Sequence, residues 1–391
     1  MRISRWPGIL SGSLVLLALA YWLFLPLGAE RYFGPSPAQH QPPYRVPAET
    51  RELHDRLLVA DLHGDTLLWS RDLLERSERG HLDIPRMVEG GIGLQTLMAV
   101  VDGPFDATRD HIDEGLDQVF FLALLDRWPL STLPSHKERA LWMAERVRDA
   151  EDQSEGKFAL LESQGDLASF LARRERSRDV TAAVLGIEGA HPTEWNVANL
   201  DVLCDAGYRL IELAHYTDTP LAGSSSGMAQ GGLTDLGREF VRRMEELGIT
   251  VDVAHASSRA IHDVLDIATR PVFASHVGVR STCDRTRNLD DTIVDRIADN
   301  GGVIGIGFFP DVICEPNLSG VVRAVRWIVD RVGAEHVAFG SGFDAPVEMP
   351  IDATGMVLLT DALLGEGFTE DQIEKIVGGN VIRVLETNLP E

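Results

Sequence analysis

Short apolar runs alternate with longer amphipathic segments from about residue 50 to the end of the chain. Eight of these runs have the length and composition of strands: Leu57–Asp61, Leu94–Val101, Thr181–Gly186, Leu210–Ala214, Thr250–Val253, Val272–Ala274, Val303–Gly307 and Val337–Phe339. Strands that alternate with helices pair in parallel, because the chain must cross over between them. The pattern therefore predicts an α/β protein built on a parallel sheet.

Helical patterns fill most of the intervals between these runs. The clearest are Leu236–Leu247, Ser258–Ala268, Asp290–Asp299, Gly320–Val332 and Thr369–Val377. The first is followed by Gly248, a residue that commonly ends helices. Eight strands with helices between them predict a (β/α)8 TIM-type barrel, with a doubly wound open sheet as the alternative. We find no glycine-rich phosphate loop of the Rossmann or P-loop type.

The first 30 residues form a separate region. Arg2 and Arg5 precede Gly8–Leu27, a segment without charged residues that is about long enough to cross a bilayer as a helix, which takes roughly 20 residues. A cleaved signal peptide is the rival interpretation, but its apolar core is usually only about 7–15 residues long. We therefore expect residues 1–30 to be an uncleaved transmembrane anchor with the arginines on the cytoplasmic side. The rest of the chain would then lie outside the cytoplasm, in the periplasm or the extracellular space.

Composition narrows the possible partners and compartments. Prolines at positions 35, 37, 42, 43 and 47 predict that residues 31–49 are an extended linker before a single domain at 50–391. The formal net charge of -24 argues against nucleic-acid binding, which requires a basic surface. Cys204, Cys283 and Cys314 lack the spacing of a metal finger. We expect buried thiols, or one disulfide whose pairing the sequence leaves open.

Histidines and carboxylates follow five of the predicted strands. His63 and Asp65 end the first run, and residues two apart in a strand point to the same side. The other strand ends carry Glu188, His215, His255 and His276. The carboxyl ends of barrel strands meet at one rim, where active sites of this fold form. Imidazole nitrogens and carboxylate oxygens both bind divalent transition metals, so the sequence predicts a metal site there. His191 and His262 are expected to be ordinary polar residues.

The number of candidate ligands indicates two metal ions. His63, Asp65, Glu188, His255 and His276 exceed the three protein ligands that are usual for one catalytic zinc. A carboxylate can bridge two cations, and paired cations about 3.5–4 Å apart can activate one hydroxide. That arrangement suits the hydrolysis of an amide or an ester.

With these residues assembled, the chain resembles the membrane (renal) dipeptidase family of the metal-dependent amidohydrolase superfamily. The resemblance extends from about Leu53 to Leu385. Further matching stretches are His81–Arg86 through Gly90-Gly91, Leu213-Ala214-His215 with Asp218-Thr219-Pro220, Ser275-His276, Arg287-Asn288 with Asp290-Asp291, and Gly379-Asn380 with Arg383-Val384-Leu385.

The resemblance implies a role for each site residue. His63 and Asp65 would hold one zinc ion, His255 and His276 would hold the other, and Glu188 would bridge both. His215 would bind the substrate carbonyl or its oxyanion. Arg287 would bind the free carboxylate of the substrate; from the residues alone, an ion pair with Asp290 or Asp291 is the alternative. Family substrates are dipeptides, including ones with a C-terminal D-residue, and homodimers are usual. Another divalent ion could replace zinc.

One motif departs from the family. Gly340-Ser341-Gly342-Phe343-Asp344-Ala345 stands where the family usually has Gly-Ser-Asp-Phe-Asp-Gly, whose first aspartate shuttles the proton. A positioned acid or base contributes about 10²–10⁴-fold, and Gly342 supplies none. Asp344 is the candidate replacement if strand alternation turns it toward the site; a structural role for it is the alternative. Three functions therefore stay open: a dipeptidase, a hydrolase of another small amide, ester or lactone, and a catalytically weak metal-containing ligand-binding protein.

Overall fold

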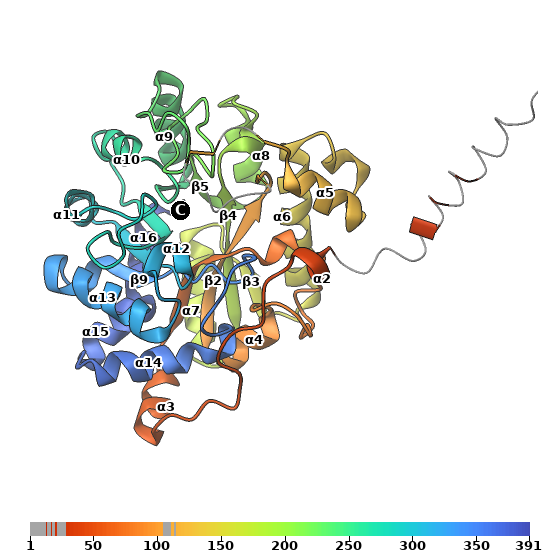
Figure 1. The fold of residues 1–391 in the computed structure, drawn as a ribbon. Coiled ribbons are helices and arrows are strands. Elements are labelled where there is room, and N and C mark those ends of the chain that lie inside the picture. Colours follow the sequence, from red (N-terminus) through yellow and green to blue (C-terminus); the bar gives the residue numbers. More distant parts are fainter. Residues whose placement is uncertain (1–12, 14–16, 18–19, 22–28, 105–110, 113–114) are drawn as a thin grey trace, which may run out of the picture.

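Eight parallel strands form a closed barrel surrounded by helices (Figure 1). The structure is a computed structural model, and it describes residues 13, 17, 20–21, 29–104, 111–112 and 115–391. The barrel strands are β1 (Val59–Gly64), β2 (Ile92–Val100), β4 (Thr181–Glu188), β5 (Tyr208–Glu212), β6 (Thr250–Asp252), β7 (Phe273–Val277), β8 (Val303–Ile306) and β9 (Val337–Phe339). All eight overlap the predicted runs.

The pairing between strands closes the ring. β2 pairs with β4 from Leu94↔Ala182 to Val100↔Glu188, and β1 pairs with β9 at Asp61↔Phe339. No open edge remains between these eight strands, so the predicted (β/α)8 barrel is confirmed and the open sheet is wrong. A ninth strand, β3 (Phe158–Leu160), extends the start of β4 before β5 takes over the same edge. Our sequence reading missed it because three residues give no usable periodicity.

Helices cross over between successive strands, as parallel pairing requires. The helices between strands are α4 (Ile84–Glu89), α5 (Gln118–Leu125), α6 (His136–Gln153), α7 (Gln164–Arg174), α8 (Asn199–Asp205), α9 (Asp235–Leu247), α10 (Ser258–Leu265), α11 (Asp291–Asp299), α12 (Pro310–Ile313) and α13 (Leu318–Val332). Before β1 lie α2 (Glu30–Phe33) and α3 (Ala48–His54), and after β9 lie α14 (Met356–Gly365), α15 (Glu370–Glu374) and α16 (Asn380–Asn388). Side chains cap several starts; Thr234 accepts from the N–H of Gly237 at α9, for example. Gly248 ends α9 in the left-handed conformation, as expected.

The last predicted helix is interrupted. Thr369–Val377 becomes α15 followed by η6 (Lys375–Gly379), a π-helical turn that leads into α16. A Cβ at Gly378 would lie 2.0 Å from the carbonyl oxygen of Leu58. Glycine is therefore needed where this turn touches the segment that enters β1.

Two apolar clusters hold the barrel together. The larger one lies between the strands and the helices, where Phe240, Val241 and Met244 of α9 are fully buried. Burying such a side chain stabilises the fold by about 1.5–3 kcal/mol. The smaller cluster joins alternate strand residues such as Ala182 and Val184 to the C-terminal helix α16. Glu188 lies in the same alternating row of β4, so this strand directs it to the barrel interior.

The predicted anchor, Gly8–Leu27, lies almost entirely outside the described residues. Among the residues that are described, none of the helices combines the length and hydropathy of a membrane span. After α2, the linker contains no helix or strand until α3. It lies along the barrel domain, where the N–H groups of Gln39 and His40 donate to the carbonyls of Met349 and Pro350, each at 2.9 Å.

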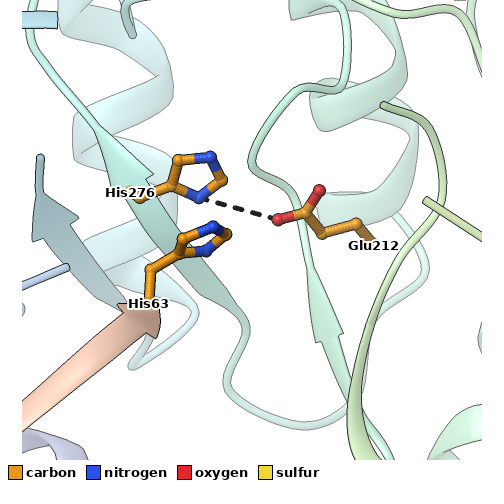
Figure 2. Close-up of side chains that lie close together, drawn as sticks. All are labelled: His63, Glu212 and His276. Atoms are coloured by element: carbon orange, nitrogen blue, oxygen red, sulfur yellow. Dashed lines mark ion pairs between the residues drawn. The ribbon is translucent and has the colours of Figure 1, made fainter. Parts of the chain in front are cut away.

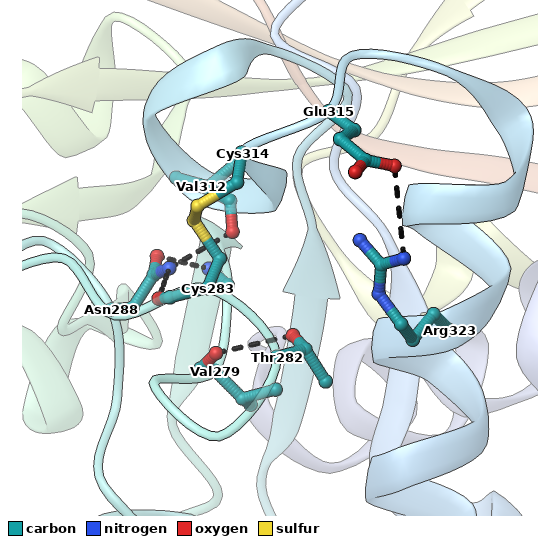
Figure 3. Close-up of a disulfide and its surroundings, with 9 residues drawn as sticks. Val279, Thr282, Cys283, Asn288, Val312, Cys314, Glu315 and Arg323 are labelled. Carbon is teal, nitrogen blue, oxygen red and sulfur yellow. Dashed lines mark hydrogen bonds and ion pairs between the residues drawn. A yellow bond between two sulfur atoms is a disulfide. The ribbon is translucent and has the colours of Figure 1, made fainter.

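A disulfide joins two loops at the carboxyl rim of the barrel. It links Cys283, in the β7–α11 loop, to Cys314 at the end of α12 (Figure 3). Beside it, the Asn288 side-chain amide donates to the carbonyls of Cys283 at 2.7 Å and Val312 at 2.9 Å. Cys204 is a free, half-buried thiol. The cysteine pairing that the sequence left open is thus defined.

Removing this disulfide should weaken the fold. A bridge over a sequence separation of 31 residues restricts the unfolded chain, and its loss typically costs about 2–4 kcal/mol. We expect Cys283→Ser/Cys314→Ser to lower the free energy of unfolding by this amount in urea titrations. Cys204→Ser is the control and should change it by less than about 0.5 kcal/mol. An equal loss in both proteins would contradict the assignment.

Candidate metal centre

Seven of the eight predicted site residues line one pocket at the carboxyl rim of the barrel. They are His63, Asp65, Glu188, His215, His255, His276 and Arg287. His63 and His276 project from β1 and β7, and Glu188 ends β4. Asp65, His215 and His255 lie within the first three residues after β1, β5 and β6. The carboxyl rim thus brings together residues that are up to 224 positions apart in the sequence, from 63 to 287.

Glu188 lies at the centre of the cluster. One of its carboxylate oxygens, Oε1, is 2.9 Å from Nε2 of His255 and 3.3 Å from Nε2 of His276. The same oxygen is 3.3 Å from Nε2 of His215 and 3.6 Å from Nε2 of His63. A single carboxylate oxygen is therefore within reach of four imidazoles that come from four strands.

The local electrostatics keep Glu188 charged. Burial alone would raise the pKa of its carboxyl, but His215, His255 and His276 hold that pKa well below its usual range. Burial lowers the pKa of His255 and of His276 well below the usual value, and the nearby Arg287 guanidinium lowers both further. An anionic Glu188 beside neutral His255 and His276 is the protonation state that metal binding requires.

Polar side chains contact the Nδ1 atoms of two histidines, His63 and His276, and orient their rings. The Ser275 hydroxyl lies 2.9 Å from Nδ1 of His276 and 3.4 Å from Nδ1 of His63. Oε1 of Glu212, inside β5, is 3.6 Å from Nδ1 of His276 (Figure 2). These contacts engage the Nδ1 side of each ring and turn Nε2 toward Glu188, as outer partners of metal-ligating histidines do.

Glu212 and Ser275 were missed in the sequence analysis. The available signal was a charged residue, Glu212, within the otherwise apolar predicted run Leu210–Ala214. Burial, Asp252 and Glu188 raise the pKa of Glu212 well above its usual range. A neutral carboxyl can donate a proton in a hydrogen bond, which an ionised one cannot.

The residues present fit divalent cations. Nε2 of His255 and Nε2 of His276 face each other at 3.0 Å, a spacing close to that of two ligands on one ion. Oδ1 of Asp65 lies 3.2 Å from Nε2 of His63 and is buried without a hydrogen-bond partner among the described residues. His63, Asp65 and Glu188 form one compact group of candidate ligand atoms. Glu188, His215 and His255 form another, so Glu188 belongs to both.

His215 is fixed by its other ring nitrogen. Its Nδ1 lies 3.1 Å from the main-chain carbonyl of Asp102, an acceptor that requires a proton on Nδ1. Its Nε2 faces Oε1 of Glu188 at 3.3 Å. A neutral His215 therefore presents an unprotonated Nε2 to the pocket, and the doubly protonated ring presents a donor.

Arg287 lies inside the pocket rather than in the alternative ion pair with Asp290 or Asp291. Its Nη2 is 2.7 Å from Nε2 of His276 and donates to the His276 carbonyl at 3.2 Å. Arg287 thus holds its guanidinium in the pocket, beside the candidate metal ligands.

The prediction that Asp344 faces the site is wrong. Asp344 is fully buried and does not line the pocket. Its carboxylate accepts from the Thr66 hydroxyl, the Arg71 guanidinium and, at 2.6 Å, the His81 N–H. The alternation of β9 does not continue to this position, because Asp344 has a φ of 69° and the strand ends at Phe339. Asp344 anchors the loops that follow β1.

Gly342 does line the pocket, at the position where the family motif has its aspartate. Its φ of 76° lies in the left-handed region that favours glycine. A Cβ placed here would be 3.0 Å from two ring atoms of Phe309 and 3.4 Å from the methyl group of Met349. Phe309 therefore packs against the space that a side chain at position 342 would need.

Metal-ligand side chains that converge on the carboxyl rim of a closed parallel barrel define the chain as a (β/α)8 metallohydrolase-type protein. Comparison with known sequences identifies the family. The chain belongs to the membrane dipeptidase family (peptidase family M19), whose sequence model matches residues 47–389.

Two curated relatives carry dipeptidase names. An uncharacterized dipeptidase of Schizosaccharomyces pombe is 32% identical over 222 residues, 54% of this chain and 53% of that protein. The dipeptidase TcpJ of Claviceps purpurea is 32% identical over 216 residues, 52% of this chain and 50% of that protein. The chain thus spans about half the length of the curated relatives it matches.

Solved structures share the fold. The probable dipeptidase PvdM from Pseudomonas aeruginosa superposes with a TM-score of 0.71 at 21% identity, covering 87% of this chain and 98% of that one. A metallopeptidase from Rhodobacter sphaeroides, solved with a phosphinate mimic of L-Ala-D-Ala, gives a TM-score of 0.69 at 24% identity and covers 85% and 99%. At these identities the likeness shows the barrel fold.

The anchoring role of Asp344 leads to a stability prediction. Asp344→Ala would leave the mostly buried Arg71 guanidinium without this partner, a change that costs about 3–5 kcal/mol. We expect that loss in thermal or urea unfolding, with the metal content of the folded protein unchanged. Asp330→Ala, which removes an exposed ion pair with Arg326 on α13, is the control and should cost about 0–1 kcal/mol. Normal stability of Asp344→Ala with reduced turnover would instead restore a catalytic role.

Proposed function

We propose that this chain is a dipeptidase that uses two divalent metal ions, zinc by the chemistry of its ligands. His63 and Asp65 would hold one ion, His255 and His276 the other, and Glu188 would bridge them. The observation that carries the proposal is the position of Glu188 Oε1, which lies within 3.6 Å of Nε2 of His63, His255 and His276. Imidazole and carboxylate ligands suit zinc, although other divalent ions also accept them.

The two ions would polarise the scissile carbonyl and supply hydroxide at neutral pH. This chain's residues would do the rest. Arg287 would bind the C-terminal carboxylate of the dipeptide through its planar guanidinium. His215, held by the carbonyl of Asp102, would donate from Nε2 to the developing oxyanion when its ring is doubly protonated. Trp69, Leu122 and Phe309 line the same pocket and would contact the substrate side chains.

We further propose that the domain works outside the cytoplasm, tethered by an N-terminal anchor. Gly8–Leu27 contains no charged residue and follows Arg2 and Arg5, a pattern typical of a signal anchor. The Cys283–Cys314 disulfide supports this location, because structural disulfides persist mainly in oxidising compartments.

A second function, ligand capture with little turnover, is favoured by one observation. The pocket has glycine at position 342, and Asp344 is committed to Thr66, Arg71 and His81. Neither residue therefore supplies a proton-transferring carboxylate to the pocket. A protein that keeps its metal ions but lacks this group would bind peptide-like ligands and hydrolyse them slowly.

Turnover and metal content together test the primary proposal. We expect the zinc-loaded full chain to release amino acids from L-L or L-D dipeptides, and a chelator to abolish this release. Glu188→Gln should bind fewer zinc ions and lose activity by at least about 10²-fold, because the bridging charge is gone. Glu366→Gln changes an exposed residue and serves as the control. Two bound zinc ions without cleavage of any dipeptide would favour ligand capture, whereas no bound metal would contradict both functions.

Restoring an aspartate at position 342 separates the two functions. Gly342→Asp alone would be strained by the left-handed backbone and by Phe309, so Phe309→Leu should accompany it. If the chain is a dipeptidase limited by proton transfer, the double variant should gain about 10²-fold in kcat. Gly342→Ala/Phe309→Leu adds the same Cβ without the carboxylate and should show no gain. Equal rates in the two double variants would argue against the proton-transfer explanation.

A further inference from the structure

A second cluster of candidate ligands lies beside the catalytic pocket. It consists of Asp102 just after β2, Asp117 at the start of α5, His136 at the start of α6 and His191 at the start of η3 (His191–Thr193). All four line one cavity, which is separate from the pocket around Glu188. Neither the family resemblance nor the proposed reaction gives these side chains a role.

The spacing of the ligand atoms is that of a metal site. Nε2 of His136 lies 3.7 Å from Oδ1 of Asp102 and 3.8 Å from Oδ2 of Asp117. Nε2 of His191 lies 3.6 Å from Oδ2 of Asp102. These distances are too long for ordinary hydrogen bonds, which measure roughly 2.7–3.2 Å. Two ligands about 2.1 Å from one tetrahedral cation are about 3.4 Å apart, close to the spacing observed.

His191, at the start of η3, has a buried ring nitrogen without a hydrogen-bond partner among the described residues. The residue is only 8% exposed, and the nitrogen concerned is Nδ1. Its other ring nitrogen faces Asp102 at a distance where no hydrogen bond forms. A buried imidazole normally satisfies its polar atoms. Nδ1 of His191 lies beside Gly189, so Nε2, which faces Asp102, is the nitrogen available to an ion in the cavity.

The charge balance permits a divalent cation. Asp102 and Asp117 contribute two negative charges, and Nη1 of Arg139 donates to Oδ2 of Asp117 at 2.6 Å. One uncompensated negative charge and two imidazoles remain. Ligand atoms of Asp102, Asp117 and His136 form one compact group, and His191 adjoins this group through Asp102.

We propose that Asp102, Asp117 and His136, with His191 adjoining through Asp102, form an accessory site for one divalent transition-metal ion such as zinc. The ion ties the end of β2 to the first turn of α6 and to the segment that follows Glu188. Its effect reaches the catalytic pocket through Asp102, whose main-chain carbonyl receives the Nδ1–H of His215. Gly103 and Pro104, the next residues, line both cavities. The accessory ion thus positions one wall of the catalytic pocket.

Counting metal ions tests this site independently of any activity. The full chain is equilibrated with zinc, freed of unbound metal by gel filtration, and analysed by mass spectrometry for zinc per chain. We expect His136→Ala and His191→Ala each to hold one ion fewer than the wild type. His40→Ala, which changes an exposed histidine elsewhere, should match the wild type. Equal zinc content in the wild type, His136→Ala and His191→Ala would overturn the proposal.

A Glu188→Gln background separates the accessory site from the proposed catalytic pair. In that background zinc should still raise the melting temperature, because an ion that binds only the folded state stabilises it. Adding His136→Ala should reduce the shift, because the zinc affinity of the accessory site should fall more than about 10-fold. Anomalous diffraction at the zinc edge should place density between Asp102 and His191. A zinc-dependent shift of the same size in Glu188→Gln and in Glu188→Gln/His136→Ala would overturn the assignment even if the catalytic pair is correct.

Discussion

The site depends on one buried negative charge. A carboxylate that leaves water pays a large desolvation penalty unless hydrogen bonds or cations compensate it. Glu188 is only 5% exposed, and the groups nearest its Oε1 are imidazole nitrogens from β1, β7 and the segments that follow β5 and β6. Neutral imidazoles compensate the charge only in part, whereas divalent cations would do so fully. The need to stabilise this one group explains why the strand ends carry histidines.

A polar layer beneath Glu188 separates the site from the apolar base of the barrel. Asp61 accepts hydrogen bonds from Ser341 and Gln95, and Asp252 accepts from the N–H of Ser275. At these positions, directional hydrogen bonds take the place of apolar packing. The barrel therefore has an apolar base that supplies stability and a hydrogen-bonded upper layer that fixes ligand orientation.

Features that depend on a local residue pattern could be predicted from the sequence. Features that depend on contacts between distant loops could not. The barrel strands could be predicted because each apolar run is continuous and bounded, and the candidate ligands because they follow those runs directly. The role of Asp344 could not be predicted. It depends on the left-handed backbone at Gly342 and Asp344 and on the approach of Arg71 and His81. The same holds for the pairing of Cys283 with Cys314, since Asn288 brings their loops together only in the folded state.

The contact between Gly342 and Phe309 also constrains how this chain can evolve. The family motif has an aspartate where this chain has glycine, and a one-step reversion would place a Cβ against the Phe309 ring on a left-handed backbone. The reverted chain would be less stable until the aromatic ring also changed. A smaller residue at position 309 would relieve the contact with the Cβ, but the left-handed backbone at position 342 would remain. While Phe309 is present, its ring disfavours any side chain larger than that of glycine at position 342. The chemistry of the pocket is then limited to what a glycine at this position permits.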